Sequence, residues 1–251
     1  MKTLIAVDIG NTSTHIAVHA GKKWRSRRRV ATQNFKAGVL SAIKAILPKN
    51  RESCVVIGSV VPQAGKYLSQ AIPEKLGLKT LLIGPKYPVP IKNLYRNPRQ
   101  VGVDRLLNGL AAFKKVHRAV IVIDFGTAIT FDVVSQKGEY LGGVIAPGIE
   151  ISLEALFQKT ALLPKTHLQH PHSIIGRDTV ESIRVGCSVG IGGLCDRIIE
   201  EIESTYHFHA KVIATGGYAS FMSRYCRRPN KILPDLIFDG ILATHKHHLS
   251  A

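Results

Sequence analysis

VDIGNTST, residues 7–14, and IDFGTAIT, residues 123–130, are two versions of one kind of turn. In each, an Asp ends an apolar run, a Gly follows two residues later, and Thr or Ser residues come next. Asp8 and Asp124 lie 116 residues apart. An apolar, β-prone run that stops at Asp and Gly is typical of a strand that ends in a tight turn. A chain that builds this turn twice is predicted to contain a duplicated architecture.

The sequence around the two turns repeats one order of elements. Hydrophobic patterning predicts strands at 3–7, 14–18 and 23–30 around the first turn, and at 119–123, 130–134 and 140–145 around the second. Helices are expected at 35–47, 63–72, 104–116, 150–162, 180–206 and 237–247, with further strands at 53–61, 80–83 and 212–214. We therefore expect an α/β protein with two halves, residues 1–115 and 116–251. The segment YPVPIKNLYRNPRQ, residues 87–100, is expected to be a shaped loop because its prolines fix φ and remove hydrogen-bond donors.

The composition is that of an ordinary globular protein. The chain has 251 residues, of which 45% are hydrophobic and 20% charged, and its longest strongly apolar runs are too short to cross a bilayer. The apolar segment near the N-terminus stops at Asp8, so we expect no secretory leader. The four cysteines form no CxxC pair, and Cys187 and Cys195 are separated by roughly 12 Å of rise on an expected helix. Buried, reduced thiols and a cytoplasmic location are expected.

The net charge of +17 is unusual, and its densest cluster is KKWRSRRR, Lys22 to Arg29. Such a charge attracts polyanions, which include nucleic acids, anionic lipids and phosphorylated metabolites. The basic run also fits the solvent-exposed face of a strand. Charge alone therefore leaves two function classes open, an enzyme that acts on phosphorylated compounds and a basic nucleic-acid-binding protein.

The chemistry of the two turns favours phosphate. Glycine lets backbone N–H groups approach a phosphate closely, and Thr and Ser hydroxyls add further donors. A carboxylate repels phosphate unless a cation lies between them, so an Asp at this point predicts Mg²⁺ bound with a nucleotide. Either turn alone could be an Asp that caps its own backbone, but the matching register of the pair favours phosphate binding. A third turn, ATGGYAS at 214–220, would let backbone approach a base or ribose.

Together these motifs resemble the superfamily of acetate kinase, sugar kinases, Hsp70 and actin, and within it the type III pantothenate kinases. The resembling stretches follow one another over almost the whole chain: DIGNT (8–12), GSVVP (58–62), YRNP with GVDRLLN (95–108), DFGTAITFD (124–132), GGVIAPG (142–148), DTVESIRVG (178–186), TGGYA (215–219) and PDLIFDGI (234–241). The P-loop signature GxxxxGK[ST] is absent. The resemblance implies duplicated ribonuclease H-like (actin-like) halves, each a mixed five-stranded sheet flanked by helices, with a cleft between them.

The resemblance also implies an activity, the ATP-dependent phosphorylation of pantothenate to 4′-phosphopantothenate, the first step of coenzyme A biosynthesis. Asp104 would be the general base that accepts the proton of the pantothenate hydroxyl. The pantothenate-binding set implied is Tyr95, Gly102, Val103, Asp104, Arg105 and Thr179. The ATP-binding set is Asp8, Ile9, Gly10, Asn11, Thr12, Ser13, Thr14, His15, Thr127, Gly216 and Gly217.

Metals and partners follow from the same resemblance. Asp8 would face Mg²⁺, and Asp124 would hold a monovalent cation, K⁺ or NH₄⁺. The family is dimeric, so a homodimer is expected, with Thr179 serving the site of a neighbouring subunit. Pantothenate is then the small-molecule partner, and neither a membrane nor a nucleic acid is expected as the main one. The alternative function remains a nucleic-acid-binding or transcription accessory factor on the same scaffold, and a phosphatase of the superfamily is a third. The histidines at 167–172 and 245–248 are expected to be surface residues without a metal.

Overall fold

The structure is a computed structural model that describes residues 3–21, 23–47, 53–229 and 231–250. It divides into two compact units, Met1–Lys114 with Asp235–Ala251, and Lys115–Pro234. The sequence-based division placed residues 235–251 in the second half, whereas here they group with the first. The cause is the packing of helix α8 (Leu236–Ser250), whose Phe238 and Ile241 lie in one apolar cluster with Leu4 and Leu107 of the first unit.

The first unit is built on a mixed five-stranded sheet in the order β3-β2-β1-β4-β5. The central strand β1 (Thr3–Ile9) runs antiparallel to β2 (Ser13–Ala20) and parallel to β4 (Ser53–Ser59). The outer strands are β3 (Lys23–Ala31) next to β2, and β5 (Lys79–Leu82) next to β4. A two-residue strand, β6 (Lys92–Asn93), lies within the proline-containing loop.

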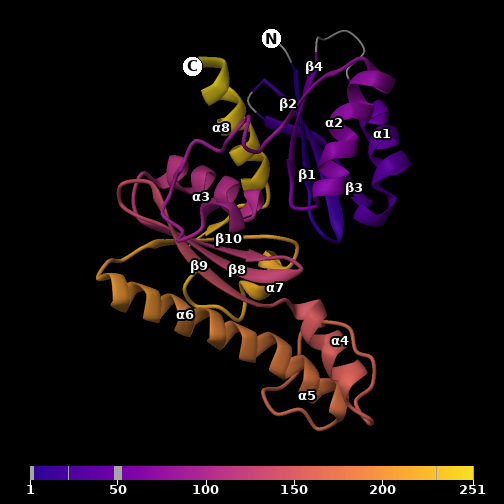
Figure 1. Cartoon of the computed structure of the whole chain (residues 1–251). Coiled ribbons are helices and arrows are strands. Elements are labelled where there is room, and N and C mark those ends of the chain that lie inside the picture. Colours follow the sequence, from indigo (N-terminus) through magenta and orange to yellow (C-terminus); the bar gives the residue numbers. More distant parts are fainter. Residues whose placement is uncertain (1–2, 22, 48–52, 230, 251) are drawn as a thin grey trace. The chain divides into compact units, whose positions relative to one another are not determined.

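Alternation along β1 explains why helices cover both faces of this sheet (Figure 1). Ile5, Val7 and Ile9 pack in a cluster with helices α1 (Phe35–Ile46) and α2 (Pro62–Leu76). Leu4 and Ala6 point to the opposite face and pack with α3 (Val103–Val116) and α8. Asp8 follows Leu4 and Ala6 in this alternation, so it lies on the α3 and α8 face of the sheet.

The second unit repeats the topology of the first. Its own strands run in the order β9-β8-β7-β10-β11. The central strand β7 (Val120–Phe125) is antiparallel to β8 (Ala128–Val134) and parallel to β10 (Lys211–Thr215), with β9 (Glu139–Pro147) and β11 (Lys231–Ile232) outside them. The predicted duplication of a mixed α/β architecture is thus confirmed.

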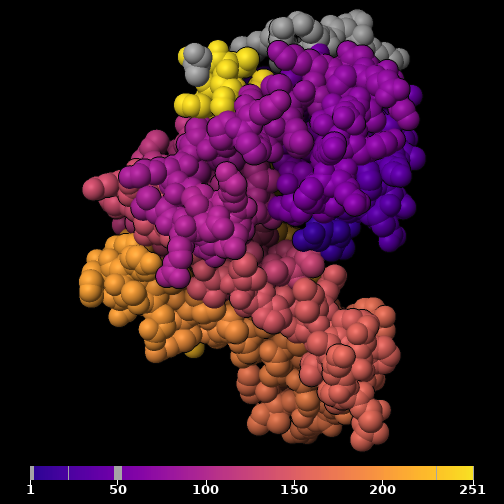
Figure 2. All heavy atoms as spheres, in the orientation of Figure 1, coloured from indigo at the N-terminus to yellow at the C-terminus, as the bar shows by residue number. Residues whose placement is uncertain are grey.

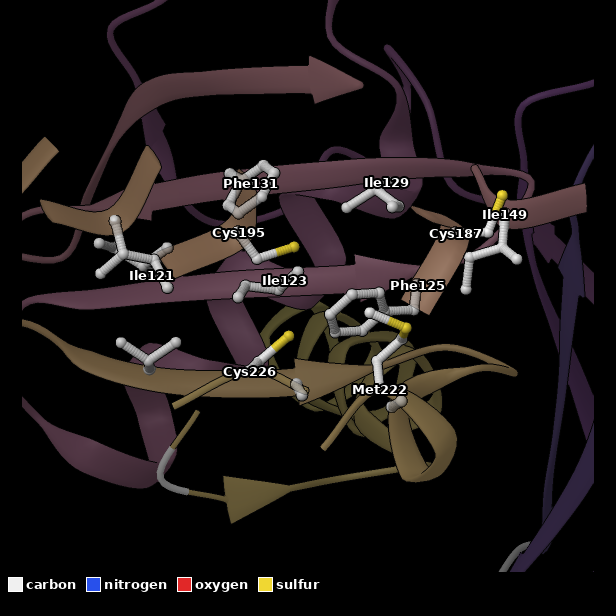
Figure 3. Packing of buried hydrophobic residues seen from close by; sticks show 14 of the residues in the cluster. Ile121, Ile123, Phe125, Ile129, Phe131, Ile149, Cys187, Cys195, Met222 and Cys226 are labelled. Carbon is white, nitrogen blue, oxygen red and sulfur yellow. The ribbon is translucent and has the colours of Figure 1, made fainter. Parts of the chain in front are cut away.

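The core of the second unit lies against one face of β7 (Figure 3). Ile121, Ile123 and Phe125 are fully buried there, and Cys195, Cys226 and Met222 pack in the same cluster. The helices of the unit are α4 (Ile149–Lys159), α5 (Thr179–Val185), α6 (Ile191–Tyr206) and the short α7 (Ala219–Met222). All four cysteines are buried and none is in a disulfide bond, as expected from the sequence.

Most predicted elements are found, and the differences have local causes. The single helix expected at 180–206 is three pieces, because a π-helical segment, Gly186–Gly190, separates α5 from α6. Glycines at both ends of that segment weaken the regular α-helical pattern, and π-helical turns are commonly found where a helix is interrupted. Short 3₁₀ helices at Thr32–Asn34 and Pro98–Gln100 carry no periodicity that a sequence pattern could reveal.

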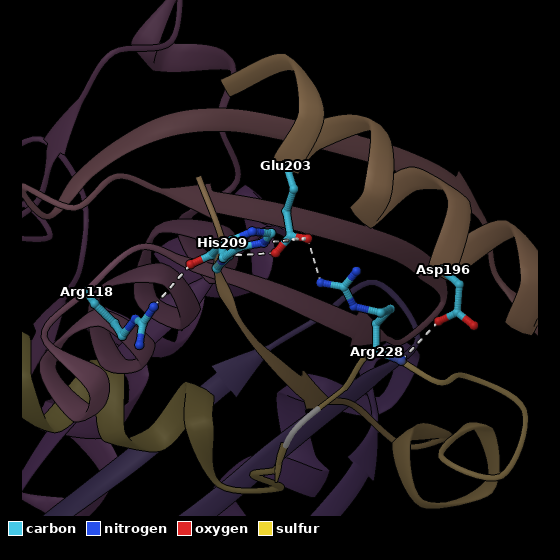
Figure 4. A network of polar contacts seen from close by, with 6 residues as sticks. Arg118, Asp196, Glu203, His209 and Arg228 are labelled. Atoms are coloured by element: carbon cyan, nitrogen blue, oxygen red, sulfur yellow. Dashed lines mark hydrogen bonds and ion pairs between the residues drawn. The ribbon is translucent and has the colours of Figure 1, made fainter. Parts of the chain in front are cut away.

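A polar network holds the chain around α6 (Figure 4). The buried Glu203 carboxylate accepts hydrogen bonds from the Ala210 amide at 2.9 Å and from Arg228 Nη2 at 2.5 Å. Two helical turns earlier on α6, the Asp196 carboxylate accepts a hydrogen bond from the Arg227 amide at 3.0 Å. Helix α6 therefore anchors both the residues that enter β10 and those that lead towards β11. In the described part of the chain, no helix has the length and apolarity needed to span a membrane.

Candidate active site

The first Asp-Gly turn connects β1 to β2 and is fixed by hydrogen bonds within the turn and by hydrogen bonds to Thr32. The Gly10 amide donates to the Ser13 carbonyl at 3.1 Å, and Thr32 Oγ1 donates to the Gly10 carbonyl at 2.8 Å. Thr14 Oγ1 and Thr32 Oγ1 lie 3.1 Å apart in a buried hydrogen bond. Asn11 and Thr12, at the tip, are exposed. The turn therefore presents a fixed backbone with polar side chains to solvent, which suits an anion.

The predicted ATP-binding residues of this turn fall into two groups. Ile9 and Thr14 are fully buried, and their side chains belong to the interior of the unit. Asp8, Gly10 and Ser13 are half-buried, and Asp8 is the cross-strand neighbour of His15 on β2 and of Gly58 on β4. Burial is the main reason that the pKa of His15 is lowered, and the positive charge of Arg29 lowers it further. His15 is thus neutral at neutral pH.

The segment 58–61 contacts both this turn and the GVDR motif, which contains Asp104, the predicted general base. The Val60 amide donates to the Ile9 carbonyl at 3.0 Å, directly beside Asp8. Val60 Cγ1 also lies 3.5 Å from the position that a Cβ on Gly102 would take. Strand β4 therefore places the first turn and the GVDR motif within one part of the first unit.

Asp104 lies in the first turn of α3, and its environment is built around its carboxylate. The Arg105 amide donates to Asp104 Oδ1 at 2.8 Å. A Cβ on Gly102 would lie 2.4 Å from the same oxygen, so a side chain at this position would displace the carboxylate from its present place. Burial raises the pKa of Asp104, and the hydrogen bond and charge of Arg105 partly offset that rise. A carboxylate with a raised pKa is a stronger proton acceptor, as a general base requires.

The remaining predicted substrate residues belong to several elements of the two units. Arg105 is 8% exposed and sits in the same helical turn as Asp104. Tyr95 belongs to the proline-containing loop of the same unit, where its amide donates to Asn93 Oδ1 at 3.0 Å. Thr179 is exposed at the start of α5 in the second unit, directly after Asp178, whose carboxylate caps the helix by accepting from the Glu181 amide at 2.8 Å.

The second Asp-Gly turn packs against two other turns of its unit through glycines. Asp124 is the parallel-strand neighbour of Thr215, and the next residue, Gly216, has φ +91°. A Cβ on Gly216 would lie 2.4 Å from Asp124 Oδ1 and 2.6 Å from the Phe125 carbonyl carbon. The Tyr218 amide donates to the Phe125 carbonyl at 3.2 Å. The predicted cation turn and the predicted adenosine turn are therefore in direct contact.

The third turn of this group was not assigned a role from the sequence. A Cβ on Gly148 would lie 2.0 Å from the Thr127 carbonyl oxygen, so the loop between β9 and α4 packs tightly on the second Asp-Gly turn. Tyr218 Oη also donates to the carboxylate of Glu150 in the first turn of α4. Gly148 ends the GGVIAPG motif, and this motif is the sequence feature that could have indicated a role for Gly148. Gly148 and Glu150 thus join Asp124, Thr127, Gly216 and Gly217 in one cluster.

These residues fit a magnesium nucleotide. Mg²⁺ in kinases commonly takes one or two protein carboxylates and fills its remaining positions with phosphate oxygens and water. Asp8, at the end of β1 beside a glycine turn, offers such a carboxylate. Among the described residues no group of three or more His, Cys, Asp or Glu side chains is placed to hold a metal. The histidines of the 167–172 segment include His170, which stacks on Phe221 with ring centroids 4.3 Å apart.

Comparison with solved structures defines the class of fold. MreB 5 of Spiroplasma citri bound to AMPPNP matches with a TM-score of 0.54 at 13% identity over 100% of this chain and 98% of that one. A conserved protein of Campylobacter jejuni, described as a Baf family transcriptional activator, matches with a TM-score of 0.64 at 20% identity over 98% and 100%. At these identities the likeness shows the fold alone, which is an actin-like fold.

Sequence comparison defines the family. The model of the type III pantothenate kinase family matches residues 4–201. Type III pantothenate kinases of Anaeromyxobacter dehalogenans (strain 2CP-C) and Persephonella marina are 38% and 39% identical, each over 98% of this chain and 99% of their own length. The chain belongs to the type III pantothenate kinase family. It is a kinase that phosphorylates pantothenate in coenzyme A biosynthesis, with ATP and a divalent metal ion, and no comparison favours the nucleic-acid-binding alternative.

Proposed function

We propose that Asp104 is the general base of this pantothenate kinase. The observation that carries the proposal is the space at Gly102, which holds the Asp104 carboxylate at the start of α3 against the Arg105 amide. Asp104 accepts the proton of the pantothenate primary hydroxyl as that oxygen attacks the γ-phosphorus of ATP. The bond from the γ-phosphorus to the bridging oxygen breaks, and ADP leaves with that oxygen's charge.

The other groups bind and orient the reactants. Arg105, buried beside Asp104, offers a planar guanidinium to the carboxylate of pantothenate or to the transferred phosphoryl group. Gly102 and Val103 contribute backbone, and Tyr95 and Thr179 contribute side chains, to pantothenate binding. These assignments follow the family resemblance, and the shared helical turn of Val103, Asp104 and Arg105 supports the first group.

The two Asp-Gly turns have separate roles in the proposal. In the first unit Gly10, Asn11, Thr12 and Ser13 bind phosphate, and Asp8 holds the Mg²⁺ that accompanies it. In the second unit Asp124 holds a monovalent cation, K⁺ or NH₄⁺, Thr127 contacts ATP, and Gly216 and Gly217 accommodate the adenosine. The direct contact of Gly216 with Asp124 supports this second set, because any shift of one turn moves the other.

We also propose that the enzyme is a cytoplasmic homodimer. Large apolar side chains are exposed in the second unit on the loop before α5 and near the start of α6, where Ile174 is 66%, Ile175 73% and Leu194 40% exposed. Figure 2 shows the atoms around α4 and α5 at the surface of the molecule. Exposed large apolar side chains are typical of protein interfaces, and Thr179 at the start of α5 lies four residues after Ile175.

A coupled assay tests the proposed function. Purified enzyme is supplied with ATP, and ADP release is followed with and without pantothenate, Mg²⁺ and K⁺, with Na⁺ replacing K⁺ as the matched control. We expect ADP release that requires pantothenate and Mg²⁺ and falls at least tenfold when Na⁺ replaces K⁺. ADP or phosphate release without pantothenate would instead indicate a phosphatase, and equal rates in K⁺ and Na⁺ would remove the monovalent cation from Asp124.

A further inference from the structure

Strand register places Arg29 in the same row of the sheet as Asp8. Asp8 on β1 is the direct partner of His15 on β2, and His15 is in turn the direct partner of Arg29 on β3. Side chains of directly opposed residues point to the same face of a sheet. Arg29 therefore lies on the same face of the sheet as Asp8, one strand beyond His15.

The neighbouring arginine of the same strand lies on the other face. Arg28 is the partner of Ile16, whose side chain belongs to the apolar cluster with α1 and α2. Arg28 and Arg29 are both exposed. The two residues have the same charge and are neighbours on β3, and they differ in the face of the sheet to which they point.

Two contacts fix Arg29 beside the first turn. Arg29 Nε donates to Ser13 Oγ at 2.9 Å, and Ser13 closes the turn by accepting the Gly10 amide through its carbonyl. The charge of Arg29 also reaches His15, since it lowers the pKa of that histidine after burial has done so. Arg27, by contrast, forms a hydrogen-bonded ion pair with Asp235 and is engaged at the start of α8.

We propose that Arg29 is a phosphate-binding residue for the nucleotide at the first turn, an inference that rests on the proposed function of that turn. A guanidinium has five N–H donors, and the bond from Nε to Ser13 leaves the terminal nitrogens to bind phosphate oxygens. The first turn supplies backbone donors and the Asp8 carboxylate, and Arg29 adds a positive charge that offsets the charge of the triphosphate. An exposed basic residue on an edge strand can also serve only to prevent edge-to-edge association, and Arg28 is the control for that role.

The test compares Arg29→Gln and Arg29→Lys with the matched controls Arg28→Gln and Arg28→Lys. Binding of Mg²⁺ with a non-hydrolysable ATP analogue is measured by calorimetry without pantothenate, and KM values for ATP and pantothenate are measured in the coupled assay. We expect Arg29→Gln to raise the Kd of the analogue and the KM of ATP about tenfold or more, because it removes a charged hydrogen-bond donor. The KM of pantothenate and all constants of Arg28→Gln should change less than twofold.

Equal effects of Arg29→Gln and Arg28→Gln would overturn the proposal, as would a change confined to the KM of pantothenate. If Arg29→Gln lowers Tm, Arg29→Lys decides, because it keeps the charge but loses the forked donor arrangement and should still weaken nucleotide binding more than Arg28→Lys. Since the calorimetry contains no pantothenate, it measures nucleotide binding by Arg29 independently of whether Asp104 acts as the general base.

Discussion

Gly216→Ala tests the contact between the two turns of the second unit. Gly216 has φ +91°, a conformation that side-chain-bearing residues rarely adopt, and the added Cβ would lie 2.4 Å from Asp124 Oδ1 and 2.6–2.7 Å from backbone atoms of Phe125. The positive φ alone costs about 1–2 kcal/mol. The backbone of Phe125 cannot rotate away as a side chain could, and such overpacking costs roughly 1–3 kcal/mol more. We expect a loss of about 2–5 kcal/mol in the free energy of unfolding.

Urea unfolding of Gly216→Ala measures this loss, and Gly217→Ala is the matched control because nothing lies within 4 Å of a Cβ there. The same displacement should move the Asp124 carboxylate, so the K⁺ concentration that gives half-maximal activity should rise in Gly216→Ala and stay constant in Gly217→Ala. Stabilities of the two variants within about 0.5 kcal/mol of each other would show that the close contacts of Gly216 do not govern stability, since surface substitutions without a specific mechanism fall in that range.

Three further predictions concern other parts of the molecule. Burial would raise the pKa of Glu203, but its hydrogen bonds from Arg228 and Ala210 outweigh burial and lower it, so the stabilisation it provides is present above its unfolded pKa of about 4.3 and is lost as pH falls through the folded value. The free energy of unfolding of the wild type should therefore fall more steeply below about pH 4.3 than that of Glu203→Gln. Parallel curves of this free energy against pH would contradict the prediction. Gly102→Ala should lower kcat with little change in Tm, because its Cβ meets only the mobile end of Asp104, and an unchanged kcat would argue against the space at Gly102. Ile175→Asp should shift the enzyme from dimer to monomer in sedimentation, with Leu249→Asp, an exposed apolar residue on the first unit, as control.

The fold was predictable because each half places a buried strand before an Asp-Gly turn. The run 119–123 is apolar on both faces, and the structure buries it completely as the central strand of its unit. The grouping of residues 235–251 with the first unit was not predictable, because the apolar face of a helix such as α8 indicates burial without indicating which sheet buries it. The π-helical segment at Gly186–Gly190 likewise leaves no distinct periodicity in five residues.

The candidate site was predictable as a set of motifs, and less so as a set of contacts. Asp8 and Asp124 could be proposed because carboxylates next to glycine turns have a definite chemistry, whereas Asp104 was proposed from the family resemblance. The glycine contacts that support them were not found, because the sequence does not show that Gly216 meets Asp124 or that Gly148 meets Thr127. Arg29 was hidden in a run of basic residues, and only the register with His15 separates it from Arg28.

The single-turnover rate of phosphoryl transfer in Asp104→Asn tests most directly whether Asp104 is the general base. Enzyme in excess over ATP is mixed with saturating pantothenate across pH 5 to 9, and ATP-analogue binding is measured in parallel. If Asp104 is the general base, analogue binding stays intact, the transfer rate falls by at least about a hundredfold, and the acidic limb that titration of Asp104 gives to the wild-type profile is lost. A transfer rate within a few-fold of wild type, with the acidic limb still present, would contradict it.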